Sequence, residues 1–316
     1  MTKKLYSLAG KRVWVAGHRG MVGSALVRRL ERENCEILTA GRETLNLLRQ
    51  DEVETWMREE RPEAVFVAAA RVGGIYANDS RPAEFIYENL MIEANIIHGA
   101  HLVDVEKLLF LGSSCIYPRM ASQPMAEDAL LTGPLEPTNE WYAVAKIAGI
   151  KLCQAYRKQH GRDFISAMPT NLYGPGDNFD LESSHVAPAL MVKTHRAKMA
   201  DDPAVEIWGT GTPKREFLHV DDLADGLVFI MERYSEAEHI NIGSGTEVSI
   251  RELAETISDV VGYRGEYRYN ADKPDGTPRK LIDCARIHAL GWRAPTGLRD
   301  GMASTYDWYL EHVANL

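Results

Sequence analysis

The sequence contains few cysteines and no long apolar run, and both features narrow what the protein can be. Its four cysteines are far apart and form no CxxC pair: Cys35, Cys115, Cys153 and Cys284. This spacing argues against a disulfide framework and against a structural zinc site. No stretch approaches the roughly 18 apolar residues of a membrane span, and the N-terminal segment has no signal-peptide core. We therefore expect a cytoplasmic protein with no metal site and no membrane contact.

Basic residues are also in the minority. The chain has 36 Lys and Arg against 45 Asp and Glu, a formal net charge of −9 at pH 7. Nucleic-acid binding depends on neutralised phosphates, so this balance argues against a nucleic-acid partner. An anionic small molecule would have to meet local positive charge. The 316 residues, 45% of them hydrophobic, are enough to bury one large core or two modest ones.

The first half of the chain alternates short apolar runs with helical patterns. This order is typical of parallel strands joined by crossover helices, and strands buried on both faces are nearly continuously apolar. A loop containing several prolines is expected over 118–137, and a helix over 139–161. The expected strands are 12–16, 36–40, 64–68, 107–111 and 164–168. We predict an α/β fold with a doubly wound, parallel Rossmann-type sheet.

The alternation weakens in the C-terminal part of the chain. The pattern there indicates a helix from about 185 to 199, a strand at 239–242, a capped helix over 249–261 and a polar loop over 272–280. We predict a second, smaller mixed α/β domain that binds substrate. Residues 1–176, with part of 217–248 returning to them, would form the NADP-binding domain. Residues 177–216 and 249–316 would form the substrate domain.

A glycine-rich segment follows the first strand directly and opens a helix: Gly17, His18, Arg19, Gly20, Met21, Val22 and Gly23. Glycines at this GxxGxxG spacing allow a tight turn and a close approach of the backbone to a pyrophosphate. The pyrophosphate then lies at the positive end of the helix dipole. The glycine triplet alone is weak evidence, but strand, spacing and helix together predict dinucleotide binding.

The end of the second strand bears on the choice of cofactor. An NAD site normally places an acidic residue there to bind the ribose 2′-hydroxyl. This strand instead ends in Gly41 and Arg42, and Arg42 with Arg19 could hold a 2′-phosphate. The alternative is two solvated arginines. Glu43 stands beside Arg42, so an acidic residue also lies near this strand end.

Tyr142 and Lys146 are four residues apart, so they share a face of the predicted helix. A lysine charge beside the phenol is expected to lower the tyrosine pKa towards a range useful for proton transfer. Ser113 and Ser114 follow a strand upstream, at the edge where parallel sheets bind ligands. The alternative is a packed tyrosine and a surface lysine.

Six segments resemble one known family. They are GHRGMVGSA from Gly17, AAARVGGIYAN from Ala68, LGSSCIYP from Leu111, EPTNEWYAVAKIAGIKLC from Glu136, MPTNLYGPGDNF from Met168 and KPDGTPRKL from Lys273. In this order they resemble the extended short-chain dehydrogenase/reductase family over essentially the whole chain. The resemblance is closest to members that convert GDP-4-keto-6-deoxy-D-mannose to GDP-L-fucose. It implies epimerisation at C3 and C5, then NADPH reduction at C4, in a homodimer.

The resemblance also implies residue roles. Ser113, Tyr142 and Lys146 would be the catalytic triad, and Cys115 and His185 the acid/base pair for epimerisation. The chemistry is consistent, because C3 and C5 both flank the C4 ketone. Loss of a proton at either carbon gives an enolate whose charge lies on O4, where Ser113 and Tyr142 would donate hydrogen bonds. Without the resemblance, Cys115 would more often be a small buried side chain and His185 a surface or packed histidine.

Further binding residues follow from the same resemblance. For the cofactor they include two segments. The first, at the end of the fourth strand, is Leu111, Gly112, Ser113 and Ser114. The second, which would line the nicotinamide end of the pocket, is Pro169, Thr170, Asn171 and Leu172. The substrate residues would be Lys193, Trp208, Arg215, Asp275 and Lys280. Three of these are cations that would neutralise a diphosphate, and Trp208 offers an aromatic surface to a base or ribose. The alternative is scattered surface charge around a core tryptophan.

Two rival functions stay open on the sequence. One is another nucleotide-sugar epimerase or 4,6-dehydratase, since such enzymes share the glycine loop and the YxxxK pair; Cys115 with His185 argues against it. The other is a non-catalytic NADP(H)-binding protein. The intact set Ser113, Tyr142 and Lys146 argues against that function.

Overall fold

The computed structural model describes residues 3–181, 183–273 and 275–314. One position of the predicted polar loop 272–280, Pro274, lies outside the described residues. Five positions of the two predicted domains do so too: 1, 2, 182, 315 and 316. None of the described helices is long and apolar enough to cross a bilayer.

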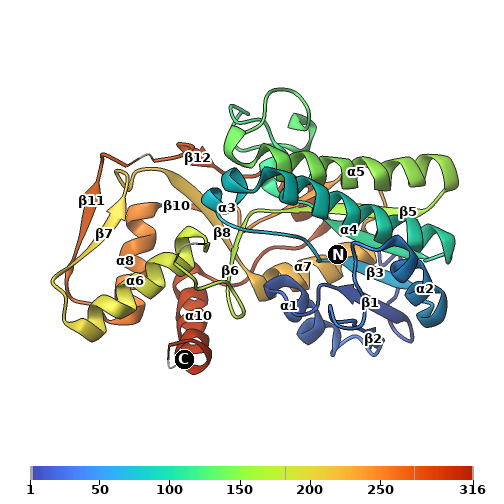
Figure 1. Ribbon diagram of the computed structural model, residues 1–316, viewed down its shortest axis with the longest axis horizontal. Helices are drawn as coiled ribbons and strands as arrows, with labels where there is room; N and C mark the ends of the chain where they lie inside the picture. Colours follow the sequence, from blue (N-terminus) through green and yellow to red (C-terminus); the bar gives the residue numbers. More distant parts are fainter. Residues whose placement is uncertain (1–2, 182, 274, 315–316) are drawn as a thin grey trace.

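The larger part of the molecule is built on a parallel sheet of six strands in the order β2-β1-β3-β4-β5-β9 (Figure 1). Every neighbouring pair in this sheet is parallel. The strands are β1 (Arg12–Ala16), β2 (Glu36–Leu38), β3 (Ala64–Val67), β4 (Lys107–Leu111), β5 (Asp163–Pro169) and β9 (Ile240–Ile242). The predicted Rossmann-type fold class is confirmed. The second strand ends two residues earlier than expected, at Leu38.

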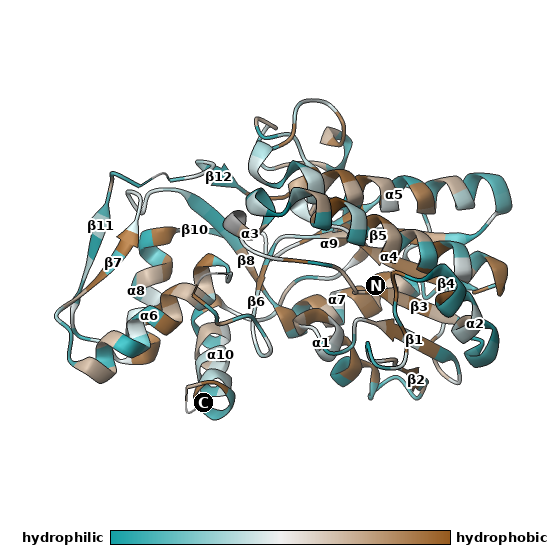
Figure 2. Ribbon diagram, viewed as in Figure 1, coloured by the Kyte–Doolittle hydropathy of each residue, from teal (hydrophilic) through white to brown (hydrophobic). Residues whose placement is uncertain are grey.

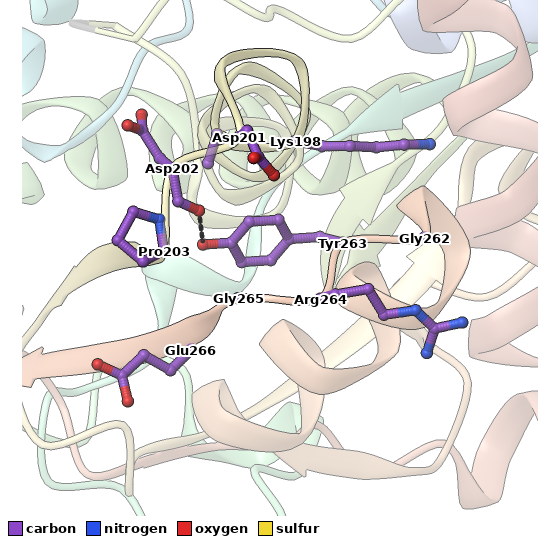
Figure 3. Close-up of a pocket in the computed structure, with 10 residues that line it drawn as sticks. Lys198, Asp201, Asp202, Pro203, Gly262, Tyr263, Arg264, Gly265 and Glu266 are labelled. Carbon is purple, nitrogen blue, oxygen red and sulfur yellow. Dashed lines mark hydrogen bonds between the residues drawn. The ribbon is translucent and has the colours of Figure 1, made fainter.

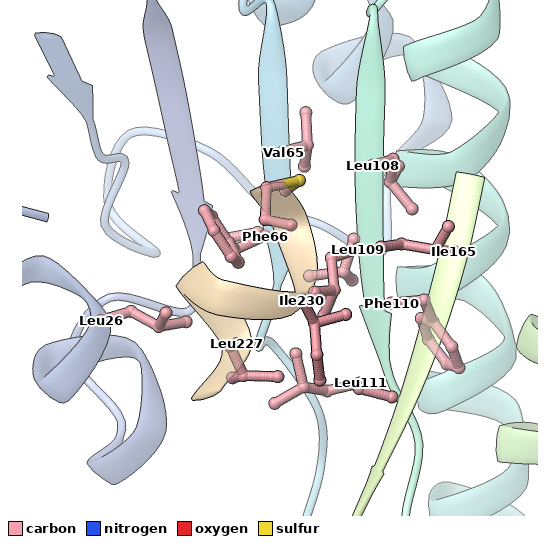
Figure 4. Close-up of a cluster of buried hydrophobic side chains, with 14 of the residues drawn as sticks. Leu26, Val65, Phe66, Leu108, Leu109, Phe110, Leu111, Ile165, Leu227 and Ile230 are labelled. Atoms are coloured by element: carbon pink, nitrogen blue, oxygen red, sulfur yellow. The ribbon is translucent and has the colours of Figure 1, made fainter. Parts of the chain in front are cut away.

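Helices cover both faces of this sheet, as crossover connections require. Helices α1 (Met21–Leu30) and α7 (Val220–Arg233) contact each other on one face. On the other face α2 (Gln50–Glu60), α4 (Pro82–Leu102) and α5 (Glu140–His160) lie in a row. Figure 4 shows Leu26 of α1 and Leu227 of α7 beside the buried side chains of β3 and β4. Both faces are thereby closed to water.

The smaller part lies beyond the carboxyl ends of β4 and β5 (Figure 1). Its strands are β6 (Asn171–Tyr173), β7 (Ala204–Trp208), β8 (Lys214–His219), β10 (Glu247–Ser249), β11 (Glu266–Asn270) and β12 (Arg279–Lys280). Its helices are α6 (Val186–Ala200), α8 (Ile250–Val261) and α10 (Leu298–His312). The predicted helix cap is present, because Ser249 and Glu252 form a reciprocal capping box that satisfies two backbone amides. The predicted loop 272–280 ends in a strand, since β12 pairs with β8.

Two separate clusters of buried apolar side chains underlie these parts. The first combines the six-stranded sheet with α7 and also takes in Ile282, Ile287 and Trp292. The second joins α6, α8 and α10. Figure 2 shows the apolar strands of the large sheet surrounded by polar outer turns. The stretch from Ile282 to Trp292, grouped above with the predicted substrate domain, therefore packs on the core of the six-stranded sheet.

The remaining elements are short. They are α3 (Ile75–Ser80), α9 (Ala285–Leu290) and the 3-10 turns η1 (Ser114–Ile116), η2 (Glu127–Ala129) and η3 (Pro137–Asn139). The proline-containing segment 118–137 is mostly loop and is tied down through Asn241, whose amide donates to the carbonyls of Met125 and Asp283. This tie holds the segment beside the end of β9.

Candidate active site

The glycine loop after β1 is built by close contacts between main-chain segments. Gly17 has a positive φ of 87°, and a Cβ there would lie 2.7 Å from the Cα of Ala69. A Cβ on Gly23 would overlap the Gly17 carbonyl. Gly20 caps α1 without a side chain, and the first turn of α1 contains no acidic residue. The amides of that turn therefore face a position suited to an anion.

The two arginines proposed for the 2′-phosphate differ in their surroundings. Arg19 is paired with Glu43, with one Nη1 to Oε2 distance of 2.8 Å and a second, shorter contact from Nη2. Arg42 is exposed and forms no hydrogen bond or ion pair with any residue that the structure describes. His18, between Gly17 and Gly20, has a buried Nδ1 without a partner among these residues, and burial lowers its pKa. The end of β2 thus offers one free guanidinium and one already engaged.

Ser113 and its neighbours stand where β4 ends, next to the end of β5. The strands run side by side from Lys107 to Leu111, and the amide of Gly112 extends this pairing by donating to the carbonyl of Ala167. Ser113 caps the short turn η1 and lies 2.8 Å, Oγ to Sγ, from Cys115. The hydroxyl and the thiol therefore share one site.

The segment after β5 is fixed by its own polar contacts. The amide of Thr170 donates to the carbonyl of Ile242, and the side-chain amide of Asn171 donates to the carbonyl of Glu216. Leu172 continues into β6. Pro169 to Leu172 are thereby held at the same sheet edge as Leu111 to Ser114.

Tyr142 and Lys146 lie on α5 above this edge. The Lys146 Nζ is 5.8 Å from the centre of the Tyr142 ring and donates a 3.0 Å hydrogen bond to the carbonyl of Leu111. Phe85 of α4 packs edge-on against Tyr142, with ring centres 6.4 Å apart. The ammonium is 3% exposed, so its position is set by the strand below it.

The expected lowering of the Tyr142 pKa is wrong for the protein chain alone. Burial raises this pKa, nearby Cys115 and Glu93 raise it further, and a hydrogen bond with Ser113 opposes the rise. Burial also lowers the pKa of Lys146, against the effects of Glu93 and Cys115. The sequence argument counted the lysine charge and left out the cost of burying ionised groups.

His185 comes from the other part of the molecule. It is the residue before α6, with an extended backbone and a solvent-accessible side chain. Desolvation by the surrounding protein, with a contribution from the charge of Lys280, lowers its pKa and favours the neutral imidazole. Just before it, the carbonyl of Ser183 accepts a hydrogen bond from the amide of Gly74. This bond ties the approach to His185 to the segment after β3.

Trp208 at the end of β7 is 62% exposed and stands between two lysines. The Nζ of Lys193, from α6, is 5.6 Å from its ring centre, and the Nζ of Lys273 is 5.3 Å away. An exposed indole flanked by cations is suited to stack against a planar group linked to phosphates. The alternative of a core tryptophan is therefore wrong.

Arg215 and Lys280 are direct neighbours, because β8 and β12 pair in parallel with these two residues in register. Burial lowers the pKa of Arg215, and the charge of Asp275 opposes this. Asp275 itself accepts hydrogen bonds from the amide and the hydroxyl of Thr210, at 2.7 and 2.8 Å. Two of the predicted phosphate-binding cations thus lie together, and Asp275 holds the loop after Trp208.

Glu216, the next residue on β8, is fully buried. Its carboxylate accepts hydrogen bonds from the amides of Gly245 and Ile282, at 2.7 and 3.2 Å. It therefore joins β8 to the turn after β9 and to the segment that follows β12.

A model of the NAD dependent epimerase/dehydratase family matches residues 13–243. The chain belongs to this family. A GDP-L-fucose synthase from Sinorhizobium fredii is 60% identical to it over 311 residues, 98% of this chain and 99% of the relative. A GDP-L-fucose synthase from Escherichia coli K12 is 56% identical over 315 residues, 96% of this chain and 98% of the relative. A solved GDP-L-fucose synthetase from Naegleria fowleri bound to NADP has a TM-score of 0.89 and 27% identity, covering 98% and 97% of the two chains.

Sequence reasoning missed several residues of the site in this member of the NAD dependent epimerase/dehydratase family. Phe85 and Glu93 of α4 contact or face the Tyr142 and Lys146 pair, and Lys273 completes the surroundings of Trp208. Glu93 had a detectable signal, since it is a lone acid between Met91-Ile92 and Ile96-Ile97 in an apolar stretch. Phe85 had none, because its partner is distant in the chain.

A surface hollow of about 640 Å³ lies elsewhere, between the ends of α6 and α8 (Figure 3). It is lined by Lys198, Asp201 to Pro203 and Gly262 to Glu266, and contains none of the predicted site residues. Tyr263 crosses it to donate a hydrogen bond to the carbonyl of Asp202. No group of three or more metal-ligating side chains suited to an ion occurs among the described residues.

Proposed function

We propose that this chain converts GDP-4-keto-6-deoxy-D-mannose to GDP-L-fucose, by epimerisation at C3 and C5 and NADPH-dependent reduction at C4. The observation that carries the proposal is the joint placement of Ser113, Cys115 and Tyr142. It combines groups that bind a ketone oxygen with a thiol that exchanges protons. The near full-length similarity to GDP-L-fucose synthases supports the same substrate.

The residues fit a dinucleotide. The absence of a Cβ at Gly17 and Gly23 lets the backbone turn tightly, and the uncapped first turn of α1 offers amides to a pyrophosphate. Arg42, with Arg19, would hold the 2′-phosphate, and the segments 111–114 and 169–172 would line the nicotinamide end. When bound, the reduced nicotinamide supplies the hydride for C4. Lys146 would also contact the nicotinamide ribose.

In the epimerisation, Ser113 and Tyr142 donate hydrogen bonds to the substrate O4. They stabilise the negative charge that develops there when a proton leaves C3 or C5. Cys115 and His185 form the acid/base pair, one removing a proton and the other returning one to the opposite face. The lowered pKa of His185 keeps its imidazole neutral near pH 7, in the state that accepts a proton.

In the reduction, Tyr142 donates its phenolic proton to O4 as C4 receives hydride. The raised pKa of Tyr142 keeps that proton in place until the oxygen becomes basic. The Lys146 ammonium, fixed on the Leu111 carbonyl, stabilises the phenolate that results. One oxygen site therefore serves both reactions.

The GDP moiety is bound by the smaller part of the molecule. Trp208, between Lys193 and Lys273, takes the base or ribose, and the adjacent Arg215 and Lys280 neutralise the diphosphate. Asp275 positions the loop after Trp208 through Thr210. We assign residues 177–216 and 249–316, apart from the stretch 282–292, to this substrate domain. Residues 1–176, with part of 217–248, form the cofactor domain, and the stretch 282–292 packs on its core.

We further propose that the protein works as a homodimer in the cytoplasm. Adjacent helices α4 and α5 carry exposed apolar side chains, including Tyr87, Leu102, Trp141 and Val144, and such surfaces favour self-association. All four cysteines are free, which fits a reducing compartment. Analytical ultracentrifugation checks the first statement, with Trp141→Glu expected to shift the protein to monomer.

The function is tested by mixing the protein with NADPH and GDP-4-keto-6-deoxy-D-mannose. NADPH absorbance should fall, and NMR of the product should identify GDP-L-fucose. Oxidation that yields another GDP-6-deoxyhexose would indicate a reductase without epimerisation. No oxidation, with NADPH still bound, would indicate the non-catalytic binding protein and overturn the proposal.

A further inference from the structure

Glu93 is a buried acid for which the mechanism above has no use. It lies on α4 and is 2% exposed, and no side chain among the described residues forms a hydrogen bond or ion pair with its carboxylate. The buried asparagines of the same helix form hydrogen bonds: the side-chain amide of Asn89 donates to the carbonyl of Phe85, and that of Asn95 to the carbonyl of Leu47. A buried carboxyl group without a side-chain partner is costly, so its presence here calls for a role.

The surroundings of Glu93 lead directly to the proposed catalytic groups. A Cβ on Gly149 of α5 would lie 3.0 Å from the Glu93 carboxyl carbon and would overlap the ring of Phe110. The Nζ of Lys146, one turn before Gly149, is 4.6 Å from the centre of that same ring. Glu93 and Lys146 therefore meet at one aromatic ring, and the small Gly149 permits the approach.

The Lys146 ammonium needs a countercharge at this place. It has three protons to donate and, among the described residues, one hydrogen-bond acceptor, the carbonyl of Leu111. Cys115 and Glu93 are the groups whose negative charge would favour it. Cys115 belongs to the substrate side of the site, whereas Glu93 is enclosed between α4 and α5.

We propose that Glu93 is a positioning residue for the reaction, and that its buried carboxylate is the countercharge of Lys146. It thereby sets the upper limit of the pH range over which Lys146 and Tyr142 both keep their protons. The inference rests on the proposed function, because Glu93 acts on the reaction through Tyr142, the proposed acid that protonates O4. The carboxylate acts through these two groups and does not touch substrate.

Removing the negative charge of Glu93 changes the pKa values of Lys146 and Tyr142 in the same direction. Glu93 raises the pKa of Lys146 and also raises the pKa of Tyr142. Cys115 also raises both pKa values, whereas the hydrogen bond with Ser113 lowers that of Tyr142. The thiol of Cys153 also faces Glu93. Burial raises the pKa of Glu93 itself to about 8, against the charge of Lys146 and the amide of Gly149, so the countercharge develops on the alkaline side of neutral pH. Without the carboxylate, both catalytic groups lose their protons at lower pH.

The test is Glu93→Gln, which preserves shape and removes the charge. Single-turnover NADPH oxidation with GDP-4-keto-6-deoxy-D-mannose is measured from acidic to alkaline pH. The alkaline limb of the rate should move down by about one pH unit, so that on this limb the variant is roughly tenfold slower than the wild type. The KM for the GDP-sugar should stay close to that of the wild type, because Glu93 does not touch the substrate.

The matched control is Glu232→Gln. Glu232 is also a buried carboxylate, 5% exposed, but it lies on α7 and pairs with Lys4 and Arg233. Its replacement should leave the position of the alkaline limb unchanged. A folded Glu93→Gln variant whose alkaline limb coincides with that of the wild type would overturn the inference. If the wild type itself does not oxidise NADPH with this substrate, it is the proposed function that fails.

A second measurement does not depend on activity or on the folding of the Glu93 variant. Infrared titration of the intact protein should detect a buried carboxylic acid that loses its proton near pH 8. In Lys146→Met the stabilising cation is gone, so this midpoint should rise by about one unit. Asp177, whose pKa burial raises to about 7, is the internal reference and should not respond. An unchanged midpoint for the higher-pH acid would refute the pairing.

Discussion

Arg42→Ala should weaken NADPH binding much more than NADH binding. Arg42 follows β2, is exposed and has no partner among the described residues, whereas the guanidinium of Arg19 is already held by Glu43. A 2′-phosphate at this edge meets Arg42 directly and must compete with a carboxylate for Arg19. Arg42 is therefore the stronger determinant of the two.

The size of the effect follows from the exposure of Arg42. A hydrogen bond to a charged group contributes about 1.5 to 3 kcal/mol. Solvent screens an exposed pair, which places Arg42 at the lower end of that range. A loss of about 1.5 kcal/mol corresponds to roughly tenfold weaker NADPH binding. NADH, which lacks the 2′-phosphate, should bind with nearly unchanged affinity.

The assay is fluorescence titration of both reduced cofactors at low and high salt. Arg32→Ala is the matched control, because Arg32 is an exposed arginine beyond the other end of α1. Glu43→Gln should act in the opposite direction, since it frees Arg19 for the phosphate. Equal losses for NADPH and NADH in Arg42→Ala would refute the assignment of this residue.

Tyr142→Phe should slow C4 reduction by about 10² to 10⁴ while NADPH binding is kept, because only the proton donor is lost; stopped-flow absorbance checks this, and near-normal reduction would mean that Tyr142 is not the acid. Cys115→Ala should abolish most deuterium uptake at C3 and C5 in heavy water, measured by mass spectrometry of the product, while reduction continues. His185→Asn should also impair epimerisation, and one labelled position would identify Cys115 as the base. Lys107→Met should destabilise the fold by about 1.5 to 3 kcal/mol in urea unfolding, because it removes the buried ion pair with Asp163 and the hydrogen bond to the carbonyl of Tyr234, while Arg157 still pairs with Asp163. An unchanged unfolding midpoint would contradict this.

The sequence predicted the cofactor part of the fold closely, for a physical reason. Strands such as Arg12–Ala16 and Lys107–Leu111 are buried on both faces, so their composition alone marks them. The order of strands and helices then follows from the short crossover connections. Family resemblance was needed to propose the specific reaction, and the chain is 60% and 56% identical to two GDP-L-fucose synthases over nearly its full length.

Contacts between distant segments were the part that the sequence could not predict. The pairing of Arg19 with Glu43 and the approach of Glu93 to Lys146 depend on how loops and helices meet in space. The prediction that the lysine charge lowers the Tyr142 pKa was wrong for the same reason, since burial is a property of the folded chain. The assignment of individual catalytic and binding residues stays a prediction until the variants are measured.

Because side chains alternate along β8, a residue that supports the fold and a residue that would bind the nucleotide can mutate independently. Arg215 and Glu216 are adjacent, but successive residues of a strand face opposite sides of the sheet. Glu216 faces inwards to the amides of Gly245 and Ile282, while Arg215 stands beside Lys280 of β12. The proposed nucleotide contact can therefore change by mutation without loss of the hydrogen bonds of Glu216. If Arg215 and Lys280 bind the diphosphate, substitutions there would alter substrate preference while the scaffold beneath stays intact.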